Sequence, residues 1–198
     1  MYPHNTEMDL SIAYALYFAA RGQGQCHESS GPASANPLSY QTPARVLLSG
    51  LGADELFGGY VRHATAFSRL GYVGLVDELK LDVGRLGKRN LGRDDRVMAH
   101  WGKEVRFPYL DEGLVRWAIE TPAWEKCDFG TVDDESGIEP GKRILRLLAL
   151  RLGLSQVARE KKRAVSLSPF HDSSTPRLHY TKSSHSDSIW FQNSEDGE

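Results

Sequence analysis

The feature that constrains the fold most is a short apolar run that leads directly into a glycine-bearing turn and a helix start. Residues 45–49 read RVLLS and lie between Pro43 and Gly50, which suits a strand buried on both faces, as in a parallel sheet. The turn and helix start that follow complete the string SGLGADELFGGY, residues 49–60. A buried strand, a glycine turn and a helix start together present backbone N–H groups to phosphate. The sequence therefore predicts an α/β fold with a phosphate site after this strand.

Around this strand the pattern is mostly helical. Thr6 can cap a helix that Gly22 ends, and the apolar residues between them recur at helical spacing. Further helices are expected from near Ala53, around Leu70 to Gly84, over Arg93 to Glu104, after Asp111, and over Lys142 to Leu152.

Two segments lack such periods. Residues 22–44 are rich in Gly, Ser and Pro and are expected to form a loop or a flexible insertion, which leaves RVLLS as the only clear strand. Residues 165–198 are rich in serine without an apolar period, which predicts a disordered tail.

The composition excludes several classes of function. A net charge of −2 over 198 residues does not suit a dedicated nucleic-acid binder. The two cysteines, Cys26 and Cys127, have no metal-binding spacing and predict neither a disulfide framework nor a structural metal. No stretch approaches the roughly 20 apolar residues of a membrane span, and the acidic start MYPHNTEMDL does not match a signal peptide. We expect a cytoplasmic protein without nucleic-acid or membrane partners.

The glycine turn suggests a specific chemistry. Gly50 and Gly52 would let the main chain approach an anion, while Asp54 and Glu55 lie in the first helical turn. Two carboxylates would repel a bare phosphate, so the arrangement suits Mg²⁺ between Asp54 and a pyrophosphate. The alternative is structural: the glycines make a tight turn, and Asp54 favours the helix dipole. On the glycines and acids alone, the two interpretations carry about equal weight.

Three blocks match a known family in order and spacing. The string LLSGLGADELFGGYVRH, residues 47–63, resembles the loop of the asparagine synthetase C-terminal domain, with its serine-glycine start, Asp-Glu pair and Phe-Gly-Gly-Tyr end. Residues 93–111 are similar to the family's arginine-led helix and Glu-x-Arg-x-Pro-Phe-Leu-Asp turn, with Tyr109 in place of the Phe. Residues 141–146, GKRILR, are similar to its helix-opening lysine before an Ile-Leu-Arg run. The string RNLGRDDR, residues 89–96, is shared with eukaryotic asparagine synthetase domain-containing proteins.

The resemblance covers residues 5–164 and implies a partial doubly wound parallel sheet of the adenine-nucleotide alpha-hydrolase type, with residues 1–164 as the C-terminal part of a synthetase domain. It implies ATP-dependent amidation of aspartate through β-aspartyl-AMP, with Mg²⁺, and with ammonia drawn from glutamine by a partner glutaminase domain. The resemblance assigns nucleotide contacts to Ser49, Gly50, Gly52 and Arg93, the metal to Asp54, and the adenylate-forming or amide-forming step to Lys142. A cation such as Lys142 near the α-phosphate would stabilise the charge that develops there.

Several residues of these blocks also have structural explanations. Glu104 and Arg106 can pair, and Asp111 can cap the helix that follows it. Lys142 can be a solvated lysine at a helix start, since helix surfaces are rich in lysine. Both kinds of explanation stay open at this point.

The remaining basic and histidine residues are interpreted conservatively. Residues 161–163, KKR, are interpreted as a solvated face, with a phosphate contact as the alternative. His63 and His100 are interpreted as packing or surface residues, because neither has a carboxylate or Cys partner at a spacing typical of a triad or metal site.

The sequence departs from the family pattern in three places. The family's Ser-Gly-Gly-x-Asp-Ser loop does not occur in it, and the start Met1-Tyr2-Pro3 lacks the cysteine that begins the glutaminase half. Leu51 stands where classical members have a glutamate associated with forming the acyl-adenylate. These departures keep two other interpretations open: a catalytically inactive relative that binds a nucleotide or a protein, and a truncated gene product. We expect no production of ammonia from glutamine by this chain.

Overall fold

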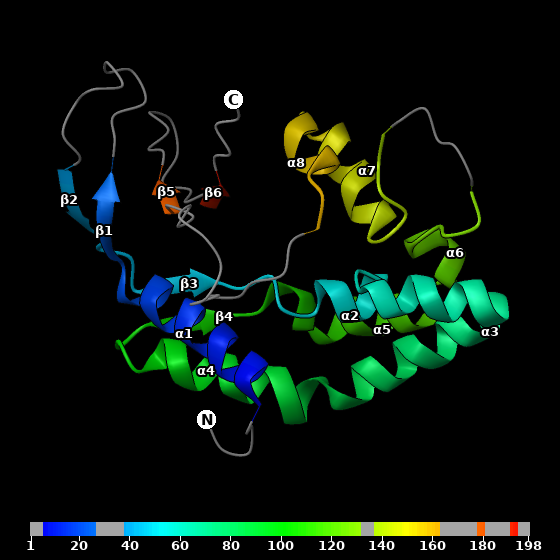
Figure 1. Cartoon of the computed structure of the whole chain (residues 1–198), viewed down its shortest axis with the longest axis horizontal. Coiled ribbons are helices and arrows are strands. Elements are labelled where there is room, and N and C mark those ends of the chain that lie inside the picture. The colour runs from blue at the N-terminus through cyan, green and yellow to red at the C-terminus, as the bar shows by residue number, and fades with distance from the viewer. Residues whose placement is uncertain (1–5, 27–37, 132–136, 163–177, 181–190, 194–198) are drawn as a thin grey trace.

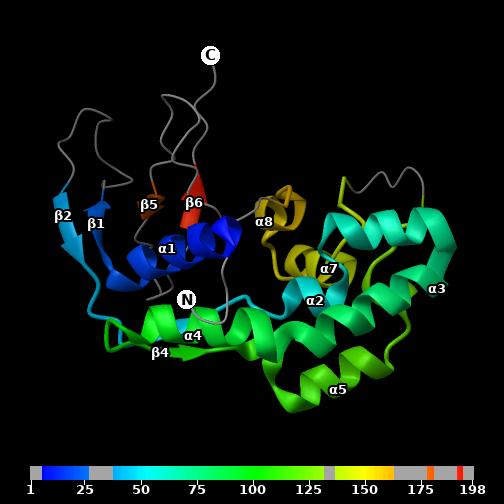
Figure 2. The same cartoon turned by 60° about the horizontal axis from the view of Figure 1, so that its bottom comes forward.

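The computed structural model describes residues 6–26, 38–131, 137–162, 178–180 and 191–193. In chain order its elements are α1 (Glu7–Arg21), β1 (Gln23–Cys26), β2 (Leu38–Gln41), β3 (Val46–Leu48), α2 (Ala53–Phe57), α3 (Val61–Leu86), the π-helix η1 (Gly87–Leu91), α4 (Gly92–Ala99), β4 (Glu104–Arg106), the 3₁₀-helix η2 (Pro108–Leu110), α5 (Glu112–Glu120), α6 (Ala123–Lys126), α7 (Arg143–Arg151), α8 (Ser155–Arg159), β5 (Leu178–Tyr180) and β6 (Phe191–Asn193). Helices α1 and α4 lie along each other beside the β3–β4 pair, while α7 and α8 lie near α2 at the other end (Figures 1 and 2).

Helix α1 begins and ends where its sequence predicts. The Thr6 hydroxyl oxygen accepts the N–H of Asp9 at 3.1 Å, which satisfies one of the free donors of the first turn. Gly22 ends the helix in the left-handed region, with φ 67°. Ala13 and Ala20 are buried, and small side chains on this face let α1 approach α4 closely.

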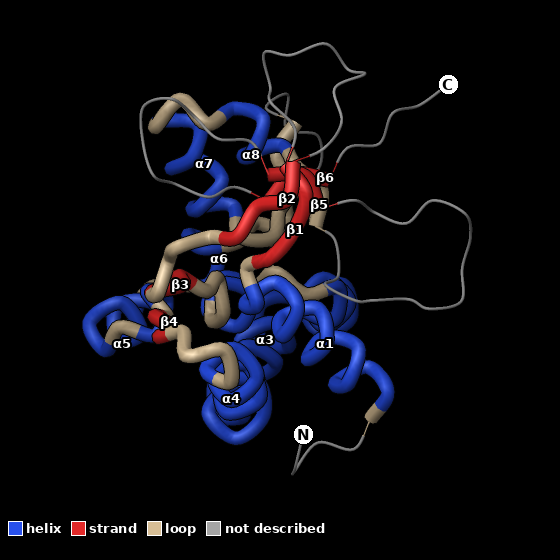
Figure 3. The backbone as a smooth tube through the Cα atoms, turned by 90° about the vertical axis from the view of Figure 1, so that its left-hand side faces the viewer, coloured by secondary structure: helices blue, strands red, loops and turns tan. Residues whose placement is uncertain are grey.

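The strands form three two-stranded sheets in the described part of the chain. Strand β3 pairs with β4 in parallel, with Val46 opposite Glu104 and Leu48 opposite Arg106. The N–H of Ser49 extends this ladder by donating to the Arg106 carbonyl at 2.9 Å. The pairs β1–β2 and β5–β6 are both antiparallel, and β1 lies beside β5 (Figure 3).

The described strands differ from the predicted secondary structure in four respects. The predicted loop of residues 22–44 contains the hairpin strands β1 and β2, and the predicted tail contains β5 and β6. The strand at β3 is not the only one, because β4 pairs with it. It is not buried on both faces either, since Val46 is 49% and Leu48 is 76% exposed. Strands of three or four residues are too short for a detectable period, and the partner of β3 comes from a distant segment. Residues 27–37 of the insertion, and the tail residues outside β5 and β6, lie outside the described residues.

Two helix boundaries also differ from prediction. Helix α3 begins nine residues before the expected Leu70, at Val61, and runs through a break at Gly71, whose φ is 61°. Helix α4 ends at Ala99 instead of Glu104, because Gly102 turns the chain with φ 66° and Glu104 enters β4. The result is a mixed α/β chain whose parallel sheet, among the described residues, consists of one pair of strands.

The core lies between α2, α3, α5 and α6 and fixes α2 in place. Leu56 and Phe57 of α2 are 2% and 0% exposed and pack with Ala118 of α5. Leu75 of α3 and Cys127 after α6 anchor a second cluster. Burial of a side chain such as Phe57 contributes roughly 1.5–3 kcal/mol, so the short helix α2 is held mainly by packing. Within the described residues, no helix combines the length and apolar composition needed to cross a bilayer, and the cytoplasmic location stays a prediction.

Candidate functional site

The glycines of the turn after β3 serve packing at one position and border open space at another. Gly52 adopts φ 100° at the start of α2, and a Cβ there would lie 2.6 Å from Leu110 Cδ2. Glycine is therefore required at this position by backbone conformation and by the contact with η2. A Cβ at Gly50 would meet no atom within 4 Å, so this is the glycine that borders open space. The Ser49 hydroxyl accepts the N–H of Leu51 at 3.2 Å and stabilises the turn.

Two further glycines make room around the end of α2. Gly58 ends the helix with φ 72°, and a Cβ there would lie 2.6 Å from Cys127 Sγ. A Cβ at Gly59 would lie 1.8 Å from Asp54 Oδ1, because the Asp54 carboxylate rests directly against the Gly59 main chain. The Phe-Gly-Gly-Tyr end of the loop thus holds the carboxylate in one place.

Two lysines from other segments meet on that carboxylate. Lys142 Nζ lies 3.0 Å from Asp54 Oδ1, and Lys162 Nζ lies 3.1 Å from Oδ2. Burial alone would raise the pKa of Asp54, but the two ammonium groups outweigh it and hold this pKa below its ordinary value of 3.8. Two cations and one anion leave the cluster with one net positive charge. We call Asp54, Lys142 and Lys162 the lysine-aspartate cluster.

The backbone of Lys142 is unusual. It has φ 55° and ψ 30°, and no other described non-glycine residue has a positive φ. Its N–H donates to the Phe57 carbonyl at 2.9 Å, which ties the start of α7 to the end of α2. A left-handed conformation costs a side-chain-bearing residue roughly 1–2 kcal/mol, and such outliers concentrate at functional sites. This lysine is also only 24% exposed, unlike a solvated lysine at a helix start.

The Tyr60 ring packs against the ammonium group of Lys162. Its ring lies between two cations, 3.9 Å from the Arg62 guanidinium and 4.0 Å from Lys162 Nζ. Its hydroxyl donates to Glu55 Oε1 at 2.6 Å, and Asn90 of η1 donates to the same oxygen at 2.9 Å. Burial, and then the Glu55 carboxylate, raise the pKa of Tyr60, so the phenol stays protonated.

A buried histidine, His63, holds the main chain of Tyr60 in place. His63 is 0% exposed; its Nδ1 accepts the N–H of Tyr60 at 3.2 Å, and its Nε2 lies 2.8 Å from Asp82 Oδ2. Because Nδ1 is an acceptor, the ring is neutral and Nε2 donates; burial correspondingly lowers the His63 pKa. His63 is a packing residue as predicted, and its carboxylate partner does not lie at the spacing of a triad or metal motif. Asp82 lies 19 residues away, beyond any motif spacing.

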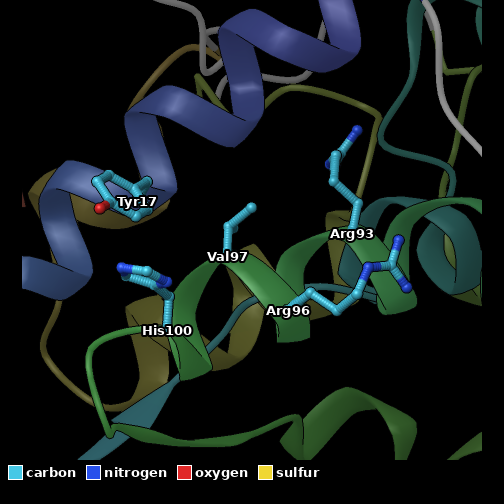
Figure 4. A pocket seen from close by; sticks show the side chains of 5 residues that line it. All are labelled: Tyr17, Arg93, Arg96, Val97 and His100. Atoms are coloured by element: carbon cyan, nitrogen blue, oxygen red, sulfur yellow. The ribbon is translucent and has the colours of Figure 1, made fainter. Parts of the chain in front are cut away.

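Arg93 lies away from the lysine-aspartate cluster, between α1 and α4. It is 4% exposed and joins two helices, with Nη1 2.9 Å from Asp9 of α1 and Nε 2.8 Å from Asp94 of α4. Figure 4 shows its side chain rising from α4 toward α1, at the edge of a cavity of ≈ 220 Å³. The lining residues are Tyr17, Arg93, Arg96, Val97 and His100. Among the described residues, none of the ion pairs of Arg93 involves the 49–60 loop.

Of the predicted site residues, the structure brings Asp54 and Lys142 together, with Ser49, Gly50 and Gly52 in the turn that precedes them. The interpretation of Lys162 as part of a solvated face is wrong, because its ammonium group contacts Asp54, while the alternative of a phosphate contact stays a prediction. The signal was the basic run itself, because Lys161 is exposed whereas the next lysine turns inward. Two structural predictions are confirmed: Arg106 pairs with Glu104 at 2.6 Å, and Asp111 caps α5 by accepting the Leu114 N–H.

The comparisons with known proteins cover this site. The model of the family described as asparagine synthase matches residues 38–77 and 70–186, which include the loop and the lysine-aspartate cluster. The chain belongs to the asparagine synthase family.

Curated relatives of this family agree with the match. Asparagine synthetase domain-containing protein 1 of Mus musculus is 44% identical over 163 residues, which cover 82% of this chain and 25% of that protein. The protein of the same name from Gallus gallus is 43% identical over 165 residues, 83% of this chain and 24% of that protein. Putative asparagine synthetase (glutamine-hydrolyzing) 1 of Methanocaldococcus jannaschii is 44% identical over 88 residues, 44% of this chain and 16% of that protein. The chain thus spans about a quarter of the length of the first two relatives. No solved structure matches it.

Proposed function

We propose that the lysine-aspartate cluster is the pyrophosphate-binding side of an ATP-dependent amide-forming site. The observation that carries the proposal is the convergence of Lys142 and Lys162 on Asp54, with ammonium-to-carboxylate distances of 3.0 and 3.1 Å. The cluster follows a parallel strand and a glycine turn, and it keeps one net positive charge for an incoming phosphate. Phosphate groups bind at such positions because lysine charges and backbone N–H groups converge there.

The reaction implied by the family resemblance is the amidation of aspartate. A side-chain carboxylate oxygen of aspartate attacks the α-phosphorus of ATP, and pyrophosphate leaves with the electron pair of the broken P–O bond, which yields β-aspartyl-AMP. Ammonia then attacks the acyl carbon, loses a proton, and displaces AMP to give asparagine. The lysines would stabilise the charge of the departing pyrophosphate, which is the step at which fixed cations contribute most. In this proposal the chain is part of a doubly wound nucleotide-binding fold, and ammonia comes from a glutaminase domain.

The residues fit a magnesium ion only together with phosphate. In the described part of the chain, no group of three or more His, Cys, Asp or Glu side chains could hold a metal by itself. Asp54 Oδ1, however, is buried and accepts no well-directed hydrogen bond from any described residue, its contact with Lys142 being an ion pair. Mg²⁺ commonly takes one or two protein carboxylates and completes its shell with substrate phosphates and water. Asp54 would be the protein ligand, and the ion would offset phosphate charge.

Binding is tested on the 198-residue chain by calorimetric titration with magnesium pyrophosphate. We expect Lys142→Met and Lys162→Met each to weaken binding by ~10-fold or more, since a hydrogen bond to a charged group contributes ~1.5–3 kcal/mol. Lys161→Met is the matched control, because this neighbouring lysine is exposed and should bind as the unaltered chain does. Equal affinities for Lys161→Met and Lys162→Met would refute the proposed site.

A second candidate function, a catalytically inactive nucleotide-binding relative, is favoured by Leu51, which replaces the family's glutamate in the turn. The two candidates separate in an assay of aspartate-dependent ATP–pyrophosphate exchange. The chain would be joined to the segment of a relative that carries the Ser-Gly-Gly-x-Asp-Ser loop. Exchange above background supports the ligase. A folded protein that binds magnesium pyrophosphate but shows no exchange supports the inactive relative.

A further inference from the structure

Arg146 is a buried arginine that the proposed reaction does not use. It lies on α7, is 8% exposed, and directs its whole guanidinium group at protein atoms. Nε donates to the Gly141 carbonyl at 3.1 Å, and Nη1 donates to the carbonyls of Ala158 and Glu160 at 2.8 and 2.7 Å. Nη2 donates to Glu139 Oε2 at 2.7 Å. One planar group thus connects the start of α7 with the end of α8.

These acceptors flank the two lysines of the cluster. Gly141 immediately precedes Lys142, and Glu160 lies two residues before Lys162. The carboxylate that Arg146 holds is itself bound to the second lysine, because Glu139 Oε2 accepts the N–H of Lys162 at 3.2 Å. Among the described residues, the guanidinium of Arg146 therefore contacts either main chain that leads into a lysine of the cluster or a carboxylate that binds the Lys162 N–H.

We propose that Arg146 is the positioning residue of the cluster: it sets the distance between the main chains of Lys142 and Lys162, so that both ammonium groups reach one carboxylate. The role of the cluster in phosphate binding rests on the proposed function, but the positioning does not. Only an arginine can do this, because its planar fork reaches acceptors on several sides, whereas a lysine ammonium is a single point charge. The competing explanation is that Arg146 merely caps the carbonyls at the end of α8 and holds α7 against it.

The position of Lys162 has a spectroscopic signature that separates these explanations. Its Nζ lies 4.0 Å from the centroid of the Tyr60 ring, so the ring current shields the neighbouring methylene protons and shifts their NMR resonance upfield. Lys162→Arg assigns this resonance by its loss. A variant that only destabilises the helix pair lowers the melting temperature but leaves the resonance in place, whereas one that releases Lys162 moves it to the ordinary lysine position.

The experiment compares Arg146→Gln and Arg146→Lys with Arg151→Gln in the 198-residue chain, since Arg151 is an exposed arginine of the same helix. We expect both Arg146 variants to lose the upfield shift and to weaken magnesium pyrophosphate binding by ~10-fold or more, as Lys162→Met does, and Arg151→Gln to change neither. Glu139→Ala is the milder variant should Arg146→Gln not fold, because the Glu139 side chain is 39% exposed.

The outcomes are distinct from those of the binding test. An upfield resonance that persists in a folded Arg146→Gln protein, or in Glu139→Ala if the former does not fold, overturns the positioning role. Absence of the upfield shift in the unaltered chain overturns it too. Loss of the shift in a chain that does not bind pyrophosphate supports the positioning role and refutes the proposed function.

Discussion

Substitution of Lys142 by glycine and by alanine measures the strain stored at the site. Both variants remove the ion pair with Asp54, so the difference between their free energies of unfolding depends on the backbone alone. Alanine keeps the cost of the left-handed conformation at φ 55°, about 1–2 kcal/mol, whereas glycine adopts it freely. Glycine also gains entropy in the unfolded chain, which offsets about 0.4–1 kcal/mol. We therefore expect Lys142→Gly to be the more stable variant by about 0.5–1 kcal/mol.

The assay is urea unfolding followed by the fluorescence of the four tryptophans. Leu148 is the matched control, since it lies inside α7 and is 51% exposed. There the order should reverse, with Leu148→Gly less stable than Leu148→Ala by about 0.5–1 kcal/mol, because glycine is unfavourable in a helix interior. The same order at both positions, with alanine the more stable, would refute the strain at Lys142.

Three further perturbations test the surroundings of the cluster. Gly59→Ala should weaken magnesium pyrophosphate binding by ~10-fold or more in calorimetry, because its Cβ would lie 1.8 Å from Asp54 Oδ1; unchanged affinity contradicts the geometry. The lowered His63 pKa means that the unfolded chain binds the proton more readily, so the free energy of unfolding should begin to fall as pH drops below 6.5, and this slope should be smaller in His63→Gln. Arg93→Met should lower the free energy of unfolding in urea by about 3–5 kcal/mol, because it removes the arginine that pairs with two buried carboxylates, and an unfolding free energy within about 1 kcal/mol of the unaltered chain would contradict this.

Sequence reasoning succeeded where the signal and its cause lie within a few residues of each other. The cap at Thr6, the helix stop at Gly22 and the cap at Asp111 each depend on a hydrogen bond or a conformation inside one helical turn. The strand at β3 was found because its five-letter apolar run is bounded by proline and glycine. The prediction that β3 is buried on both faces is wrong, because burial depends on what covers a strand and not on the composition of the strand.

Contacts between distant segments could not be predicted from the spacing of residues in the sequence. The β4 strand, the Asp82 partner of His63 and the approach of Lys162 to Asp54 are all made by tertiary packing. Lys162 could not be separated from its exposed neighbour Lys161 by composition, because the two differ only in the direction of their side chains. Family resemblance supplied Lys142, and the backbone adds an independent reason to single it out, since few side chains tolerate its conformation.

The glycine turn and the charged groups therefore contribute different things to the site. The sequence predicts that Gly52 lets the main chain approach an anion, and its positive φ and its contact with Leu110 add a packing reason for glycine at this position. Gly59 likewise accommodates the Asp54 carboxylate. The turn sets the place of one anion, and the cations come from segments that follow much later in the chain. A glycine motif of this kind thus indicates the conformation of the loop. In our proposal, phosphate binding depends on whether Lys142 and Lys162 reach that loop, and Arg146 positions both of them.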